Sequence, residues 1–222
     1  MHSSFEKLTL LKNKIKEIVD EKQLKNNPKI IVVTKTFSLN KITSLLNSGH
    51  LHFGENKIQE AESKWLEAKK CYTNLQLHMI GKLQTNKAKK AIKLFDYIHS
   101  LDNKKLALKL YQHEKELNKK CKFFIQVNLA EEGQKSGIML NSLRDFYKYC
   151  TSELSLNIIG LMCLPPANSK SYKFFKLLKK TAEQLNLKDL SMGMSSDYEQ
   201  AILNGSTYLR LGTIILGQRN FN

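Results

Sequence analysis

The stretch IIVVTKT at residues 30–36 sets the interpretation of the whole chain. Four consecutive β-branched residues are typical of a strand buried on both faces, as in a parallel sheet. Seven further strand-length apolar runs follow along the chain, at 51–53, 75–80, 95–98, 122–127, 156–162, 187–192 and 207–211. Stretches with helical apolar spacing separate them, including 39–48, 57–70, 104–119 and 172–185.

Strand and helix patterns that alternate in this way predict a parallel sheet with crossover helices. Eight such units favour a closed (β/α)8 barrel. The alternative, a doubly wound open sheet, would need a glycine-rich turn after the first strand to bind a nucleotide, and residues 33–37 have none. We therefore predict an α/β protein with one TIM-like barrel domain spanning residues 1–222.

One further amphipathic segment, at residues 5–21, precedes the first strand and predicts an extra N-terminal helix. Its predicted buried face consists of Phe5, Leu8, Leu11, Ile15 and Ile18.

The composition is that of an ordinary globular protein, with 41% hydrophobic and 25% charged residues. The apolar runs are too short to span a membrane, and the N-terminus shows no secretory signal. Four cysteines lack any CxxC spacing, so we expect reduced thiols and a cytoplasmic protein.

The net charge of +16 raises the question of nucleic-acid binding. Only three of the 36 basic residues are arginine, however, and the lysines are scattered along the chain. Proteins that read a nucleic-acid groove rely on arginine and cluster their basic residues. Specific nucleic-acid binding is therefore the least favoured of the functions that we consider.

The carboxyl ends of the strands are where a barrel carries its chemistry. Lys35 follows the first strand, so its stem would be packed and its amine would project into the barrel mouth. Loss of solvation disfavours the ammonium form and makes such an amine nucleophilic. The alternative is a lysine whose stem covers apolar surface while its amine stays in water.

Polar residues also follow the second and third strands. Asn56 would either cap the next helix or point into the mouth. His78 fits a hydrogen-bonded core histidine better than a base or ligand. His50 and His52 share a face of their strand but lack a third ligand at zinc spacing, so no metal site is expected.

The last third of the chain predicts a phosphate site. Residues 190–197, LSMGMSSD, run from a strand through a glycine turn into a serine-capped helix start that includes Ser195. The final strand ends in Gly212 and Thr213, and barrels often bind phosphate after these last two strands. Arg210 lies within that strand and needs an acceptor, which could be an acidic neighbour. A lysine, a phosphate cradle and an inward arginine together suit pyridoxal 5′-phosphate (PLP).

The chain from about residue 30 onward resembles the PLP homeostasis protein family, whose barrel is like the N-terminal domain of alanine racemase. The resemblance is carried most specifically by FGEN at 53–56 and by SMGMSSD at 191–197. Departures from the family pattern are apolar replacements at Leu77, Met79 and Leu216, and an apparently shorter 167–188 segment.

The resemblance implies that PLP is held as an internal aldimine on Lys35. By the same resemblance, Asn56 would lie beside the cofactor, Ser195, Gly212 and Thr213 would hold its phosphate, and Arg210 would face its pyridine nitrogen. An arginine there does not share a proton with the ring, which disfavours transaminase-type chemistry.

We therefore expect a monomeric, non-catalytic PLP-binding regulator or carrier that maintains vitamin B6 pools, with PLP-requiring apo-enzymes as candidate partners. The chain ends soon after the last barrel segment, so we expect no second domain to supply the opposite-face tyrosine of racemases. A true amino-acid racemase is the alternative, and it would need a tyrosine such as Tyr198 or Tyr208 facing the cofactor.

Overall fold

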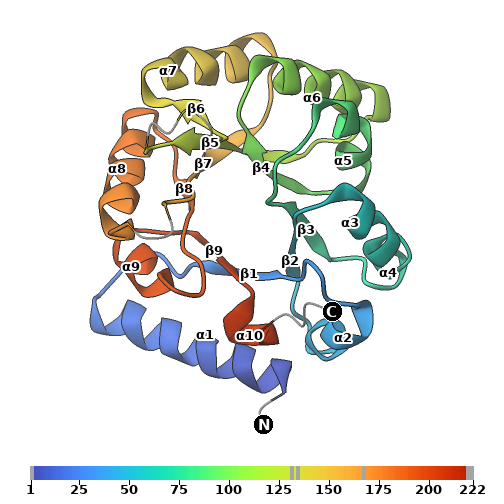
Figure 1. Ribbon diagram of the computed structural model, residues 1–222, viewed down its shortest axis with the longest axis vertical. Helices are drawn as coiled ribbons and strands as arrows, with labels where there is room; N and C mark the ends of the chain where they lie inside the picture. Colours follow the sequence, from blue (N-terminus) through green and yellow to red (C-terminus); the bar gives the residue numbers. More distant parts are fainter. Residues whose placement is uncertain (1–2, 131–132, 134–135, 167–168, 219–222) are drawn as a thin grey trace.

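The computed structural model describes residues 3–130, 133, 136–166 and 169–218. Within these residues, eight parallel strands form a closed barrel in the order β4-β3-β2-β1-β9-β8-β7-β5, and pairing of β4 with β5 closes the ring (Figure 1). The strands are β1 (Lys29–Val33), β2 (His52–Glu55), β3 (Gln76–Met79), β4 (Tyr97–Leu101), β5 (Lys122–Asn128), β7 (Ile158–Met162), β8 (Asp189–Ser191) and β9 (Tyr208–Leu211). The predicted barrel is confirmed, and each of the eight apolar runs contains or overlaps one strand. A short additional strand, β6 (Ile138–Met139), pairs with β5 beside the barrel.

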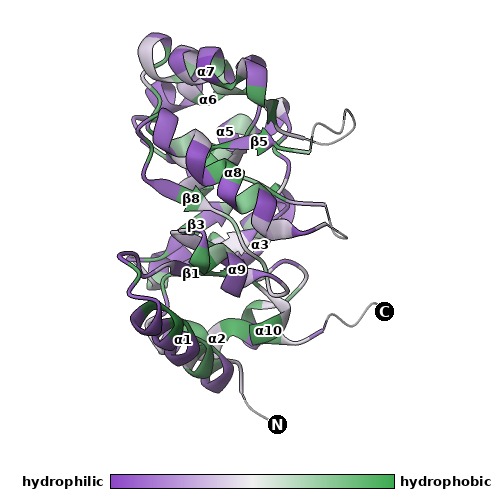
Figure 2. Cartoon of the chain, turned by 90° about the vertical axis from the view of Figure 1, so that its left-hand side faces the viewer, coloured by the Kyte–Doolittle hydropathy of each residue, from purple (hydrophilic) through white to green (hydrophobic). Residues whose placement is uncertain are grey.

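Helices surround the barrel (Figure 1). They are α1 (Ser4–Glu21), α2 (Leu39–Asn47), α3 (Ile58–Trp65), α4 (Ala68–Cys71), α5 (Ala88–Leu94), α6 (Lys104–Leu117), α7 (Leu140–Lys148), α8 (Ser171–Gln184), α9 (Tyr198–Leu203) and α10 (Thr213–Leu216). A 3-10 turn (Thr85–Lys87) precedes α5 and a π-helical turn (Tyr149–Glu153) follows α7. In Figure 2 the helices carry hydrophilic and hydrophobic residues together, as expected of helices with one face on a sheet.

The prediction of a single helix over residues 57–70 is wrong, because α3 ends at Trp65 and α4 begins at Ala68. Trp65 and Ala68 are both buried, so the two helices keep one apolar face. Apolar spacing alone therefore does not reveal the break between them.

The N-terminal helix is confirmed, and a reciprocal cap fixes its start. The Ser3 hydroxyl accepts from the Glu6 N–H, and the Glu6 carboxylate accepts from the Ser3 N–H. Leu8, Leu11 and Ile15 are buried, and Ile18 packs partly buried against the core. Phe5 is 46% exposed, so its predicted burial is wrong. Helical spacing shows which face of a helix a residue is on. It does not show how far along the helix that face is covered by the core.

Residues of the strands alternate between two packed regions. Ile30 and Val32 belong to the main core between the strands and the helices, whereas Ile31 belongs to a second cluster. That second cluster also contains Tyr97, Phe124, Met162 and Tyr208. Because alternate residues of a strand share a face, Val33 lies on the side of Ile31, and the chain then enters Thr34 and Lys35 at the carboxyl end of β1.

Candidate functional site

A cavity of about 670 Å³ lies at the carboxyl ends of the strands. It is lined by Val33, Lys35, Asn56, Ile80, Leu164, Met194, Ser195, Ser196, Arg210, Gly212 and Thr213. All six predicted site residues are in this lining, although they come from four separate strand ends. The volume is in the usual range for a small-molecule site, about 300–1,000 Å³. Sequence reasoning missed the apolar lining residues and Ser196, which carry no distinctive local pattern.

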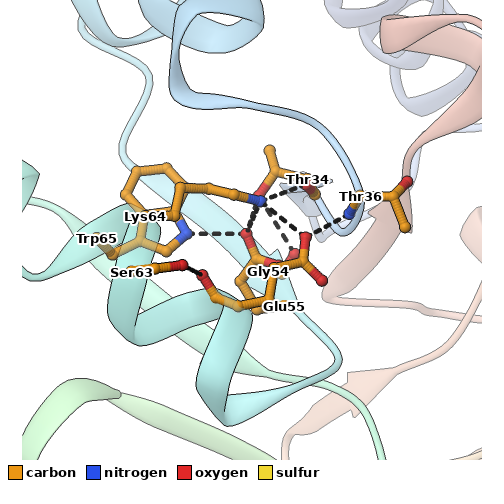
Figure 3. Close-up of polar contacts among 8 residues, drawn as sticks. Thr34, Thr36, Gly54, Glu55, Ser63, Lys64 and Trp65 are labelled. Carbon is orange, nitrogen blue, oxygen red and sulfur yellow. Dashed lines mark hydrogen bonds and ion pairs between the residues drawn. The ribbon is translucent and has the colours of Figure 1, made fainter.

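Lys35 is half-buried between two threonines whose backbones are held by other elements. The Thr34 hydroxyl is buried and donates to Oε1 of Glu55 at 2.6 Å. Thr36 has a left-handed backbone with φ of 69°, and its N–H donates to Oε1 of Glu60 (Figure 3). A left-handed φ is uncommon for a β-branched residue, so the surrounding contacts must maintain it.

Asn56 lies in the turn after β2 and lines the cavity. The alternative that Asn56 caps the next helix is wrong, because α3 begins at Ile58 and Lys57 occupies the cap position without a side-chain bond. Gly81 fixes the local path of the chain. A Cβ at Gly81 would come within 2.3 Å of the Asn56 carbonyl oxygen, so only glycine allows this close approach.

The residues of the predicted phosphate site lie in two loops that meet. Gly193 has φ of 92°, and a Cβ there would lie 2.5 Å from the Cβ of Ala201, so a larger residue does not fit. Ser195 lines the cavity, and its Oγ accepts from the Ile214 N–H at 3.4 Å, which links the β8–α9 loop to α10. Its predicted place at the helix cap is wrong, because α9 begins only after Asp197. Asp197 occupies the cap position instead, and its Oδ1 accepts from the Met194 N–H at 2.7 Å within the loop.

Arg210 is buried at 4% exposure and still reaches the cavity. Its NH1 group donates to Ser191 Oγ at 2.6 Å, and its NH2 group donates to the Cys163 carbonyl at 2.9 Å. Within the described residues these acceptors are neutral, so the alternative of a buried ion pair with an acidic neighbour is wrong. The hydrogen bonds hold the guanidinium in one orientation at the cavity wall.

A chain of histidines continues from Ser191 through the barrel interior. Ser191 Oγ lies 2.8 Å from His99 Nδ1, His99 Nε2 lies 2.9 Å from His78 Nδ1, and His78 Nε2 lies 2.9 Å from His52 Nδ1. Arginine only donates, so the Ser191 hydroxyl keeps its own proton, and when it donates that proton to His99 Nδ1 each ring donates from Nε2 to the next. Burial holds the pKa of His78 and His99 well below the usual value and lowers that of His52 to about 4. The prediction that His78 is a hydrogen-bonded core histidine is confirmed.

Other predicted features can be placed as well. All four cysteines are unpaired, and Cys121, Cys150 and Cys163 are buried. Among the described residues, no group of histidine, cysteine or acidic side chains is arranged to hold a metal, and no helix could cross a membrane. Part of the 167–188 segment, which departs from the family pattern, lies outside the described residues.

Comparison with known proteins gives the class that fits this fold and site. Residues 8–220 match the family described as "Alanine racemase, N-terminal domain". An alanine racemase from Clostridium difficile has the same fold, with a TM-score of 0.72 at 15% identity over 98% of this chain and 58% of the racemase. This barrel is therefore of the alanine racemase N-terminal type.

More similar relatives narrow the class. A pyridoxal phosphate homeostasis protein of Synechocystis is 38% identical over 86% of this chain and 91% of its own. The Haemophilus influenzae protein of that name is 32% identical over 97% and 95%. PipY of Synechococcus elongatus, solved without PLP and with PLP bound, superposes with TM-scores of 0.82 and 0.80 at 33% identity, over 91% of this chain and all of PipY. The chain belongs to the pyridoxal phosphate homeostasis protein family.

Proposed function

We propose that this protein binds PLP in the 670 Å³ cavity and serves PLP homeostasis, with the cofactor linked covalently to Lys35. The observation that carries the proposal is the convergence of an amine, an amide, hydroxyls and a buried guanidinium from four strand ends on one cavity. The PLP-bound structure of PipY, a relative of similar length and fold, supports it.

The residues present fit the aldehyde, the phosphate and the ring of this cofactor. PLP supplies an aldehyde that condenses with a primary amine, and Lys35 is the lysine in the cavity lining. Ser195, Gly212 and Thr213 bring hydroxyls and small backbone-exposing positions to the same cavity, as a phosphate requires. Arg210 stays protonated, so toward a pyridine nitrogen it would donate a hydrogen bond without giving up a proton.

We further propose that the protein acts as a regulator or carrier and not as an efficient enzyme. The relatives that match across most of their length are named homeostasis proteins. The two tyrosines considered for the racemase alternative, Tyr198 and Tyr208, are not among the residues that line the cavity. The Tyr208 hydroxyl accepts from Lys29, and the Tyr198 hydroxyl donates to Glu199. Their place outside the lining supports the proposal, because racemisation requires a second base on the face opposite Lys35.

The test combines a binding and a turnover measurement. Equilibrium dialysis of the purified protein against PLP should give bound cofactor with an imine absorption band, and absence of binding would contradict the proposal. The loaded protein should then leave the α-hydrogen of L- and D-alanine unexchanged in deuterium oxide. Exchange at an enzymatic rate of about 1–10³ s⁻¹ would show that the protein catalyses abstraction of the α-hydrogen, and would contradict the proposal.

Delivery of PLP to apo-enzymes and a monomeric state stay predictions. Loaded protein mixed with a PLP-requiring apo-enzyme should restore its activity faster than free PLP at the same concentration. Sedimentation at micromolar concentration should give one species of about the chain mass of 25.6 kDa. Equal rates of restoration or a dimer mass would contradict these two predictions.

A further inference from the structure

A buried ion-pair network lies directly behind the loop that carries Lys35 (Figure 3). Lys64 on α3 has only 6% of its side chain exposed. Its Nζ donates to the Thr34 carbonyl at 2.7 Å, to Glu55 Oε1 at 2.8 Å and to Glu60 Oε1 at 3.1 Å. An ammonium group has three protons, so this side chain is fully used in holding its neighbours.

The Thr34 carbonyl belongs to the peptide group before Lys35, and the Thr36 N–H belongs to the peptide group after it. Lys64 holds the first and Glu60 holds the second. Rotation about the two backbone bonds of Lys35 would move one of these peptide groups. With both held by α3, the Cα–Cβ direction of Lys35 is fixed, and with it the point from which the amine reaches into the cavity.

Glu55 anchors the network from the end of β2. Its side chain is fully buried, and Oε1 accepts from Thr34 Oγ1, Lys64 Nζ and Trp65 Nε1 at 2.6–2.8 Å. Its second oxygen, Oε2, has no hydrogen-bond partner among the described residues. A buried ion pair of this kind is weak support for stability, since apolar residues of similar size often serve equally well. Its position around Lys35 gives it a different role.

We propose that Lys64 and Glu60 are positioning residues that hold the Lys35 amine in the geometry for covalent capture of PLP. The inference rests on the proposed function. In the step concerned, the neutral Lys35 amine bonds the aldehyde carbon, a carbon–nitrogen double bond forms, and the carbonyl oxygen leaves with the two amine protons as water. The network touches neither cofactor nor reacting atoms and acts through the backbone of Lys35.

The test separates capture from simple binding. The rate of covalent capture is followed by the imine absorbance after apo-protein is mixed with PLP. Binding to the cradle alone is measured with pyridoxine 5′-phosphate, which has the phosphate and ring but no aldehyde. Glu60→Ala removes the acceptor of the Thr36 N–H, whereas Glu60→Gln keeps an oxygen there. Glu62→Ala is the matched control, because Glu62 lies on the same helix and pairs with Lys90.

We expect Glu60→Ala to slow capture about ten- to a hundredfold while pyridoxine 5′-phosphate affinity stays within twofold, since small misplacements of a reacting group have effects of this size. Glu60→Gln should recover most of the rate, and Glu62→Ala should match the unaltered protein. Lys64→Met should slow capture at least as much as Glu60→Ala does. If Lys64→Met does not fold, the comparison of Glu60→Ala with Glu60→Gln still tests the proposal.

Two results would overturn the proposal. Capture by Glu60→Ala at the unaltered rate would show that the network does not position Lys35. An equal loss of capture and of pyridoxine 5′-phosphate affinity would show a general structural defect. Failure of the proposed function looks different, because the unaltered protein itself would then form no covalent link with PLP.

Discussion

Strand β1 carries a lysine at each end, and the two lie in opposite kinds of surroundings. Lys29 begins the strand, and its amine lies 5.0 Å from the centroid of the Tyr208 ring and donates to the Tyr208 hydroxyl at 3.2 Å. Lys35 follows the other end and lines the cavity. The same residue type therefore packs on an aromatic ring at one end of the strand and lines the cavity just beyond the other end.

The rest of the barrel interior repeats this contrast. At the amino end of the barrel, Lys122 of β5 lies over the Tyr97 ring, as Lys29 lies over the Tyr208 ring. The histidine chain lies in the barrel interior next to these rings. At the carboxyl end, loops replace packed rings and polar groups face the cavity. Parallel strands bring all their carboxyl ends to one rim, so strand direction decides which of the two lysines lines the cavity.

The largest expected effect comes from removing each lysine in turn. Lys35→Ala should abolish covalent capture of PLP, measured by the imine band, while pyridoxine 5′-phosphate still binds because the phosphate cradle is intact. Lys29→Ala should capture PLP normally and lose about 1 kcal/mol of unfolding free energy with its ring contact, measured by urea denaturation. Covalent capture of PLP by Lys35→Ala, or loss of that capture in Lys29→Ala, would contradict the distinction between the two ends of β1.

A second effect belongs to the buried histidines, which are the chain described above and His50, whose pKa burial lowers to about 4. In the unfolded chain each histidine takes up a proton near pH 6.5, whereas burial keeps His78 and His99 neutral in the folded protein to well below that pH. Below pH 6.5 the unfolded state therefore binds more protons than the folded state. The free energy of unfolding is highest above pH 6.5 and falls as the pH is lowered. Each of these two histidines should contribute about 1.4 kcal/mol of loss per pH unit.

Urea denaturation between pH 7 and 5 measures this loss. His78→Gln should make the dependence on pH shallower. Stability that does not change between pH 7 and 5 would contradict the assignment of buried neutral histidines.

The smallest effect concerns the phosphate side of the cavity. Ser195→Ala removes one hydroxyl and should weaken pyridoxine 5′-phosphate binding about fivefold, the effect of roughly 1 kcal/mol for one hydrogen bond. Ser142→Ala, which removes an exposed hydroxyl on α7, is the control. Calorimetric titration measures both, and unchanged affinity in Ser195→Ala would place the phosphate elsewhere.

The fold was largely predictable because runs of β-branched residues such as 30–33 mark buried parallel strands directly. The residues of the cavity were predictable because strand ends in a barrel converge, which brings Lys35 and Arg210 to one cavity from opposite ends of the chain. The acceptors of Arg210 could not be predicted, since Ser191 and the Cys163 carbonyl have no sequence signal.

The network behind Lys35 was missed for a related reason. Glu60 and Lys64 are four residues apart on a helix, which usually indicates an exposed ion pair. Only the packing of α3 against the ends of β1 and β2 shows that Lys64 is buried and turned toward the Thr34 carbonyl.

The central claim is that the amine at the carboxyl end of β1 carries the cofactor. Borohydride reduction of the PLP-treated protein, followed by digestion and mass spectrometry, tests it most directly. The account predicts one phosphopyridoxyl group on the peptide that contains Lys35. A label on Lys29, or one spread over the surface lysines with Lys35 unmodified, would contradict it.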